Sequence, residues 1–221
     1  MSNPVPEMKA RNPRTGKCDY RFSPATSAVV TATANDLRRN QPEWQALGLV
    51  ARADAMCRFA DAIQSRRDEL ISVLVADTGR LSQSMLEVDA LAPMIRLNIG
   101  FAKTLLADGP PQASFFPGVV ARAQLVPFPL VGVVSPWNFP LLLAMIDSIP
   151  AFLAGCAVLF KPSEVTPRHS DVLTACFTDV PELRRVAAVV RGAGDIGSAV
   201  VDAVDAVCFT GSVRTGRLVA E

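Results

Sequence analysis

One stretch, VGVVSPWNFPLLLAMIDSIPAFLAGCAVLFKPSE at 131–164, constrains the fold of this 221-residue chain more than any other. An apolar run at 131–135 leads into the polar turn SPWNFP, an amphipathic helix is predicted over 140–154, and a second apolar run at 157–160 ends on KPSE at 161–164. Strand, helix and strand in this order predict a βαβ unit with parallel strands. The polar residues after both strands would then share one edge of the sheet, where open α/β sheets bind ligands.

The alternation continues toward the end of the chain. Further strands are predicted at 186–190 and 206–209, with helices near 167–178 and 196–203 and another from Val213. Thr166 before Pro167 is typical of an N-cap followed by the first helical position. The predicted fold class is therefore α/β, a parallel sheet flanked by helices.

The part before 131 reads differently. Residues 1–34 are rich in Pro, Thr and Ala, which favours extended surface chain with short strands. A helical pattern runs from 44 to 107, broken by a C-cap at Gly79. The pair Ser84 and Glu87 fits a capping box near the start of its last long helix.

Phenylalanines and β-branched residues between 110 and 129 predict a β-hairpin, with a bend near Gly118. From the residues alone, this hairpin is a local surface feature.

Composition excludes several classes of protein. With 22 basic and 21 acidic residues, the net charge of +1 gives no reason to expect nucleic acid or an anionic membrane as a partner. Prolines interrupt the most apolar run, 130–146, so it predicts a strand and a helix rather than a membrane span. The first residues show no apolar signal segment. The five cysteines lack metal-ligand spacing, so no metal site is predicted, and reduced thiols in the cytoplasm are expected.

Three motifs in the same order resemble the NAD(P)-dependent aldehyde dehydrogenase superfamily. They are the SPWNFP turn at 135–140, the KPSE turn at 161–164 and Phe-Thr-Gly-Ser at 209–212, and an Asn-Pro-Arg-Thr-Gly turn at 12–16 adds to them. The resemblance covers nearly the whole chain. It implies a Rossmann-like core at 130–221, an N-terminal part of the cofactor-binding domain at 1–109, and an oligomerisation arm at 110–129.

Asn138 follows a strand, where a neutral amide could stabilise a developing oxyanion, although asparagine is also common in turns. The resemblance implies that Asn138 donates a hydrogen bond to the tetrahedral intermediate. It also implies that Ser135, Pro136 and Trp137 line the nicotinamide side of the cofactor channel.

Lys161 and Glu164 stand at a strand end, where they suit the two hydroxyls of a ribose. A surface ion pair is the alternative from spacing alone. The resemblance places both residues on the adenosine ribose, with Ser163 as a further candidate on the same turn. The Glu164 carboxylate would repel a 2′-phosphate, so NAD is the expected cofactor and NADP the alternative.

Two glycine-containing segments follow the later strands. Gly192 to Gly197 fits GxGxxG, but the acidic residue expected about 20 positions later is missing. These two glycines are assigned either to close approach near the adenosine end or to a plain tight turn. By resemblance, Gly211 and Ser212 lie beside the cofactor pyrophosphate; Phe209 is a candidate there, although core packing is favoured.

His169 is predicted to be a solvated surface residue, and none of the five cysteines matches the family's nucleophile. The family's general-base glutamate and catalytic cysteine domain would fall beyond residue 221. The expected function is oxidation of an aldehyde by the intact parent, which is expected to be a homo-oligomer, with this chain an inactive fragment. The alternative is a non-catalytic nucleotide-binding or assembly module.

Overall fold

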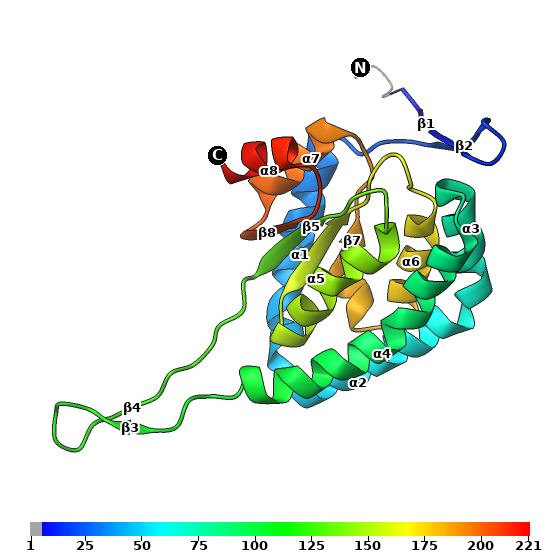
Figure 1. Cartoon of the computed structure of the whole chain (residues 1–221). Coiled ribbons are helices and arrows are strands. Elements are labelled where there is room, and N and C mark those ends of the chain that lie inside the picture. Colours follow the sequence, from blue (N-terminus) through cyan, green and yellow to red (C-terminus); the bar gives the residue numbers. More distant parts are fainter. Residues whose placement is uncertain (1–5) are drawn as a thin grey trace.

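A parallel sheet of four strands forms the centre of the molecule (Figure 1). The computed structural model describes residues 6–221. The strands are β5 (Leu130–Val134), β6 (Ala157–Lys161), β7 (Ala187–Val189) and β8 (Ala206–Phe209), in the order β7-β6-β5-β8. All three pairings are parallel, which confirms the predicted α/β fold.

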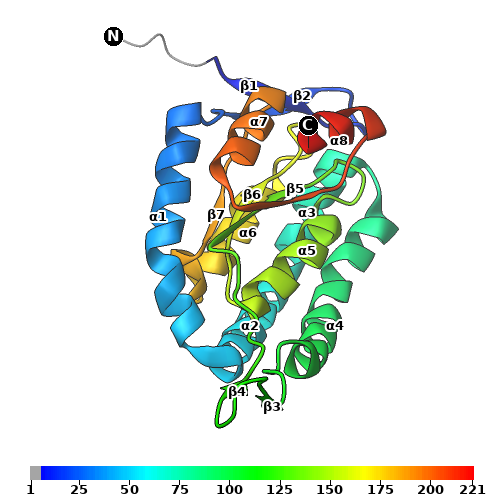
Figure 2. The same ribbon diagram turned by 90° about the vertical axis from the view of Figure 1, so that its left-hand side faces the viewer.

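Helices cover both faces of this sheet (Figure 2). Helices α1 (Ser27–Ala46) and α7 (Gly194–Ala203) pack together on one face. Helices α5 (Pro140–Ala154) and α6 (His169–Thr178) lie on the other face. An outer layer of α2 (Gly48–Ser65), α3 (Arg67–Thr78) and α4 (Leu81–Leu105) packs against α5 and α6. The remaining helices are the short η1 (Leu183–Arg185) and the last helix, α8 (Val213–Ala220).

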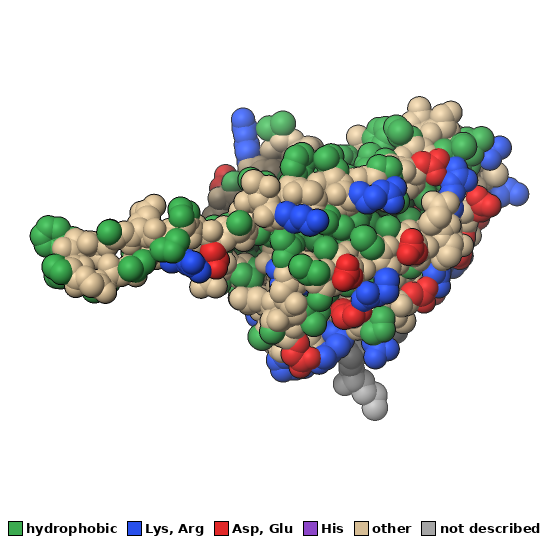
Figure 3. Space-filling view, turned by 90° about the horizontal axis from the view of Figure 1, so that it is seen from below, with side chains coloured by type: hydrophobic (Ala, Val, Ile, Leu, Met, Phe, Trp, Pro, Cys, Tyr) green, Lys and Arg blue, Asp and Glu red, His purple; other side chains and the backbone are tan. Residues whose placement is uncertain are grey.

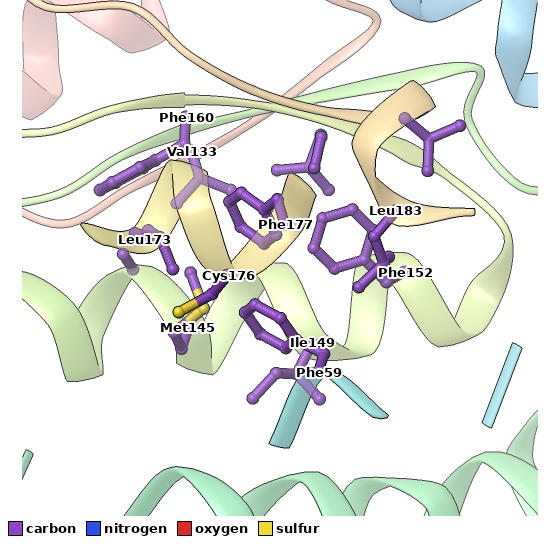
Figure 4. Packing of buried hydrophobic residues seen from close by; sticks show 14 of the residues in the cluster. Phe59, Val133, Met145, Ile149, Phe152, Phe160, Leu173, Cys176, Phe177 and Leu183 are labelled. Atoms are coloured by element: carbon purple, nitrogen blue, oxygen red, sulfur yellow. The ribbon is translucent and has the colours of Figure 1, made fainter. Parts of the chain in front are cut away.

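The central strands are apolar on both sides because helices cover both faces of the sheet. All five residues of β6 are buried, and so are four of the five in β5. Between the sheet and the outer helices, Phe59 of α2 stacks on Phe177 of α6 with ring centroids 4.9 Å apart, and Phe152 of α5 meets Phe177 edge-on at 5.9 Å (Figure 4). Each fully buried phenylalanine stabilises the fold by about 2–3 kcal/mol.

The strand order reverses once. From β5 the chain steps outward to β6 and β7, then passes through α7 on the opposite face and returns to pair β8 with β5. The carboxyl ends of β5 and β8 therefore flank a topological switch point, which is where open α/β sheets form a binding crevice.

The predicted extended chain at 1–34 is wrong from Ser27 onward. Strands β1 (Met8–Arg11) and β2 (Cys18–Phe22) do form a hairpin, but helix α1 follows directly. The Thr26 side chain accepts a hydrogen bond from the Val29 N–H at 3.2 Å and caps that helix. A buried face with helical spacing stabilises α1 despite its weak helix formers. The residues of this face are Val30, Ala34, Leu37, Gln41 and Trp44.

Two predicted helix starts also need correction. The Ser84 hydroxyl donates to the Arg80 carbonyl, and Glu87 points toward another helix, so no capping box forms. Helix α6 begins at His169 with Arg168 as its N-cap, two residues later than predicted from Thr166. The predicted C-cap is confirmed, because Gly79 adopts φ 73° and donates to the Val75 carbonyl.

The predicted hairpin projects from the body of the molecule (Figure 3). Strands β3 (Gln112–Ala113) and β4 (Val120–Ala121) pair antiparallel, and Gly118 supplies a positive φ of 80° in the connecting turn. Phe115 is 95% exposed and Phe116 is 66% exposed. No helix within residues 6–221 has the length and apolar character that crossing a bilayer requires.

Candidate functional site

A cleft of about 970 Å³ opens at the carboxyl edge of the sheet, at the switch point. Its walls are the segments that follow β5, β6 and β8, together with one face each of α7 and α8. The structure brings eleven of the twelve predicted site residues to this cleft: Ser135, Pro136, Trp137, Asn138, Lys161, Ser163, Glu164, Gly197, Phe209, Gly211 and Ser212. The volume lies at the upper end of the range typical of small-molecule and cofactor sites.

The β6 wall carries an ion pair. Lys161, the last residue of β6, is only 5% exposed, and its Nζ lies 3.4 Å from Oε2 of Glu164. Burial lowers the pKa of the Lys161 ammonium, and the Glu164 carboxylate opposes that shift. The Glu164 side chain remains 39% exposed, so a carboxylate held beside a buried cation faces the cleft.

The β5 wall begins with Ser135, whose main-chain N–H donates to the Lys161 carbonyl at 3.2 Å. The Ser135 hydroxyl oxygen is buried and has no hydrogen-bond partner among the described residues. Since buried polar groups normally form hydrogen bonds, a ligand in the cleft is a fitting partner for the Ser135 hydroxyl. Trp137 and Asn138 lie further out and are exposed.

Two residues that sequence reasoning missed hold the Asn138 loop. The Arg80 guanidinium donates to the Asn138 carbonyl and lies 5.0 Å from the centre of the Phe139 ring. The fully buried Glu87 carboxylate accepts from the N–H groups of Leu141 and Leu142, both at 3.0 Å, at the start of α5. Burial raises the pKa of Glu87, and the two N–H donors oppose that shift.

The sequence did contain a signal for Glu87. It shares helical spacing with other buried residues of α4, namely Ser84, Val88, Leu91 and Ile95, and therefore lies on the inner face. A carboxylate on such a face requires hydrogen-bond donors, and a helix N-terminus supplies them.

The glycine motif at 192–197 overlaps the start of a helix. Helix α7 begins at Gly194, inside the motif. Gly192 is buried and does not line the cleft; a Cβ there would stand 2.3 Å from Ile196. Close packing within the fold therefore explains Gly192. Gly197 does line the cleft, and Ser198 and Asp202 on the same face of α7 are lining residues that the prediction omitted.

The β8 wall is built on Phe209, whose half-buried ring lies against Gly211. A Cβ on Gly211 would approach this ring to 2.5 Å, so a larger residue there would displace the ring. The Thr210 N–H donates to the Val134 carbonyl at 3.1 Å. Ser212 caps α8 by accepting from the Thr215 N–H at 3.2 Å.

The prediction of a solvated His169 is wrong. Its side chain is fully buried at the start of α6, with Nδ1 3.0 Å from the Thr166 carbonyl. Burial lowers the pKa of this imidazole to about 4. Helix α6 turns His169 inward toward Phe160, whose ring centroid is 6.1 Å away.

Comparisons with known proteins show which family this chain resembles. A model described as "Aldehyde dehydrogenase family" matches residues 1–221. The structure of PutA from Anabaena variabilis, provisionally assigned as an aldehyde dehydrogenase, is 47% identical with a TM-score of 0.93 over 97% of this chain and 46% of its own. The structure of a NAD-dependent benzaldehyde dehydrogenase from Corynebacterium glutamicum is 28% identical with a TM-score of 0.90. The match covers 99% of this chain and 48% of that protein.

A curated relative from Mycolicibacterium smegmatis, provisionally named succinate-semialdehyde dehydrogenase [NADP(+)], is 37% identical over 89% of this chain and 38% of its own. The chain thus spans less than half the length of the curated relatives it matches. The family uses NAD or NADP, and the similar proteins include members named for each cofactor.

Proposed function

Because the chain belongs to the aldehyde dehydrogenase family, we propose that it binds NAD in the switch-point cleft as part of an enzyme that oxidises an aldehyde to a carboxylic acid. The observation that carries this proposal is the placement of Asn138 and the Lys161–Glu164 pair at the ends of adjacent strands, on one cleft. That arrangement provides separate positions for a dinucleotide and for a reacting carbonyl group.

The residues present fit an extended dinucleotide. Glu164 would accept hydrogen bonds from the adenosine ribose hydroxyls, and Lys161 would donate to them. The unpartnered Ser135 hydroxyl and the Gly211–Ser212 turn supply polar groups along the β5 and β8 walls. A carboxylate at the ribose disfavours a 2′-phosphate, so we assign NAD rather than NADP as the cofactor.

NAD, when bound, accepts the hydride that leaves the substrate carbon. The role of Asn138 is to donate its side-chain N–H to the substrate oxygen as negative charge develops there, which a neutral amide can do without introducing a charge of its own. Arg80 and Glu87 hold the loop that presents this amide. Trp137 supplies an apolar wall beside it.

The cofactor assignment is tested by titrating NAD and NADP into the protein. Lys161→Ala and Glu164→Ala should each weaken NAD binding about tenfold, because each removes hydrogen bonds to a charged group. Glu164→Ser should improve NADP binding relative to NAD. Glu69→Ser, on the exposed surface of α3, is the matched control. Unchanged affinity of the Glu164 variants for both cofactors would contradict the assignment.

A polypeptide of the printed sequence should not oxidise aldehydes by itself. None of the five cysteines lines the cleft within residues 6–221. Burial raises the pKa of both Cys156 and Cys176 to about 11, which disfavours the reactive thiolate. NADH formation above a heat-treated control, with a panel of short, long and aromatic aldehydes, would overturn this expectation.

We assign the projecting hairpin to self-association within a homo-oligomer. Its support is the exposure of Phe115 and Phe116 next to a short open strand edge. Light scattering should show association that is lost when residues 112–121 are replaced by a short glycine-serine linker. The free thiols, including the exposed Cys18 and Cys57, suit a reducing compartment, so we assign the protein to the cytoplasm.

A further inference from the structure

The turn at 162–168 carries Ser163 and Glu164 into the cleft, and most of its hydrogen bonds are internal. The Thr166 N–H donates to the Ser163 carbonyl at 3.3 Å, and the Val165 N–H donates to the Ser163 hydroxyl at 3.2 Å. Others lead into the first turn of α6, and Glu164 pairs with Lys161 at the end of β6. Among the described residues, the hydrogen bonds and ion pairs that reach further from this turn all belong to Arg168.

Arg168 is bound on several sides. Its main-chain N–H donates to Oδ2 of Asp77 at 2.8 Å, and its guanidinium Nη1 lies 3.4 Å from Oδ1 of the same carboxylate. The guanidinium also pairs with Asp19 on β2 and lies 5.2 Å from the centre of the Tyr20 ring. The Arg168 side chain is 7% exposed and the Asp77 side chain is fully buried.

This ion pair belongs to the part of the molecule behind the cleft. Asp77 lies in the last turn of α3, and neither Asp77 nor Arg168 lines the cleft. A buried charge that loses its partner is strongly destabilised, so the carboxylate and the guanidinium each fix the position of the other. Since α3 is packed against α4 and α6, Asp77 provides the turn with a fixed point of attachment.

We propose that Asp77 and Arg168 are positioning residues for the ribose-binding turn: they hold Glu164 at the distance from Lys161 that the adenosine ribose requires. This inference rests on the proposed NAD site. Glu164 lies only four residues before Arg168, so a shift of Arg168 is passed along a short segment to the carboxylate that meets the ribose. Small displacements of a binding group are costly because hydrogen bonds weaken steeply with distance and angle.

The decisive experiment pairs a protein variant with a ligand variant. At pH 8.5, where the Asp77 carboxyl is ionised, Asp77→Asn keeps the shape of the side chain and an oxygen for the Arg168 N–H but removes the charge that faces the guanidinium. It should weaken binding of NAD about tenfold while changing the affinity for the NAD analogue without both adenosine ribose hydroxyls less than about twofold. Isothermal titration measures both. Asp179→Asn, which breaks the pair with Arg66 at the other end of α6, is the matched control and should affect neither ligand.

A second variant covers the case in which Asp77→Asn folds poorly. Asp19→Asn changes only the outer partner of Arg168, since the Asp19 side chain is 42% exposed. It should give a smaller loss of NAD affinity with the same dependence on the ribose hydroxyls. In a Glu164→Ala background, Asp77→Asn should add no further loss of NAD affinity, because the group it positions is gone.

Two results would overturn the inference in different ways. Equal losses for NAD and the analogue, or no loss for either, would leave Asp77 and Arg168 a purely structural pair while the ribose contact stands. An unchanged NAD affinity in Glu164→Ala alone would reject the proposed ribose contact, and with it the positioning role.

Discussion

The β6 wall and the β8 wall of the cleft differ in how firmly the fold holds them. Every residue of β6 is buried, whereas all four residues of β8 are half-buried and helix α8 buries none. Strand β6 pairs on both sides, with β5 and β7, while β8 pairs with β5 alone among the described strands. Within residues 6–221, the ribose side is therefore built into the core, and the side assigned to the pyrophosphate opens more easily.

The buried charges follow the same division. The Lys161 ammonium and the Asp77–Arg168 pair lie at or behind the β6 wall, where desolvation makes their geometry exacting. The β8 wall presents neutral groups, the Gly211 backbone and the Ser212 hydroxyl, close to solvent. The β6 wall therefore holds its charged groups in fixed positions, whereas the groups of the β8 wall are neutral.

The largest expected effect compares two phenylalanines, one in each wall. Phe160 of β6 is 1% exposed, so Phe160→Ala should lower the free energy of unfolding by about 3–5 kcal/mol through lost burial and a cavity. Phe209 of β8 is only half-buried, and Phe209→Ala should cost about 1–2 kcal/mol. Urea denaturation with a common slope measures both. Equal costs would mean that the two walls are equally embedded.

The buried histidine behind the β6 wall gives the next effect. Its pKa is lowered to about 4 in the folded protein, so between pH 6.5 and 4 the unfolded chain binds more protons. The stability contributed by neutral His169 is thus complete above pH 6.5 and is lost as the pH falls toward 4, by up to about 3 kcal/mol. Replacement by glutamine, which can still bond the Thr166 carbonyl, should remove this dependence.

Comparison with the His169→Gln variant is needed because Asp77 acts in the opposite direction. Burial raises the pKa of the Asp77 carboxyl to about 7, while Arg168 opposes the shift. The folded protein therefore binds the extra proton between the ordinary pKa of Asp77 and 7, and its contribution to stability grows as the pH falls. The difference between wild-type and variant unfolding curves isolates the histidine; parallel curves from pH 7 to 4 would contradict the assignment.

The sequence predicted the elements whose apolar pattern is continuous or strictly periodic. Strand β8 and helix α5 were predicted with the observed boundaries, and β5, β6 and β7 within one or two residues. Nearly all predicted cleft residues lie at one edge of the sheet because the carboxyl ends of parallel strands share that edge. In contrast, α1 was missed before Trp44, since Val30 and Leu37 on its buried face alternate with the small Ala34 and the polar Gln41, which weakens the hydrophobic signal.

The remaining misses concern side chains whose environment depends on distant segments. Asp77 and Glu87 are buried against partners far away in the chain, Arg168 and the start of α5, whereas His169 is buried beside the nearby Phe160. Local spacing gives no information on such a partner. The packing of α3 and α4 against α5 and α6 shows which groups the two carboxylates meet.

A smaller effect should appear in the β8 wall at Ser212. Its hydroxyl caps α8, and Ser212→Ala should destabilise that helix by about 1 kcal/mol. Since α8 buries no residue, the change should remain local: hydrogen exchange should accelerate in α8 and stay unchanged in β6. Faster exchange across the whole sheet would show that the two walls open together.

The smallest expected effect has opposite signs for stability and for binding. Gly197 lies in α7 on the cleft face, and a Cβ there would meet nothing closer than the Lys161 Cδ at 3.9 Å. Gly197→Ala should therefore stabilise the protein by about 0.5–1 kcal/mol, because alanine loses less backbone entropy in a helix. If NAD approaches α7 closely beside the β6 wall, the same methyl group should weaken NAD binding severalfold. Gly100→Ala in α4, where a Cβ also meets open space, is the control and should change stability alone. A stabilised Gly197→Ala protein with full NAD affinity would reject a close approach of the ligand at Gly197 and place it away from α7.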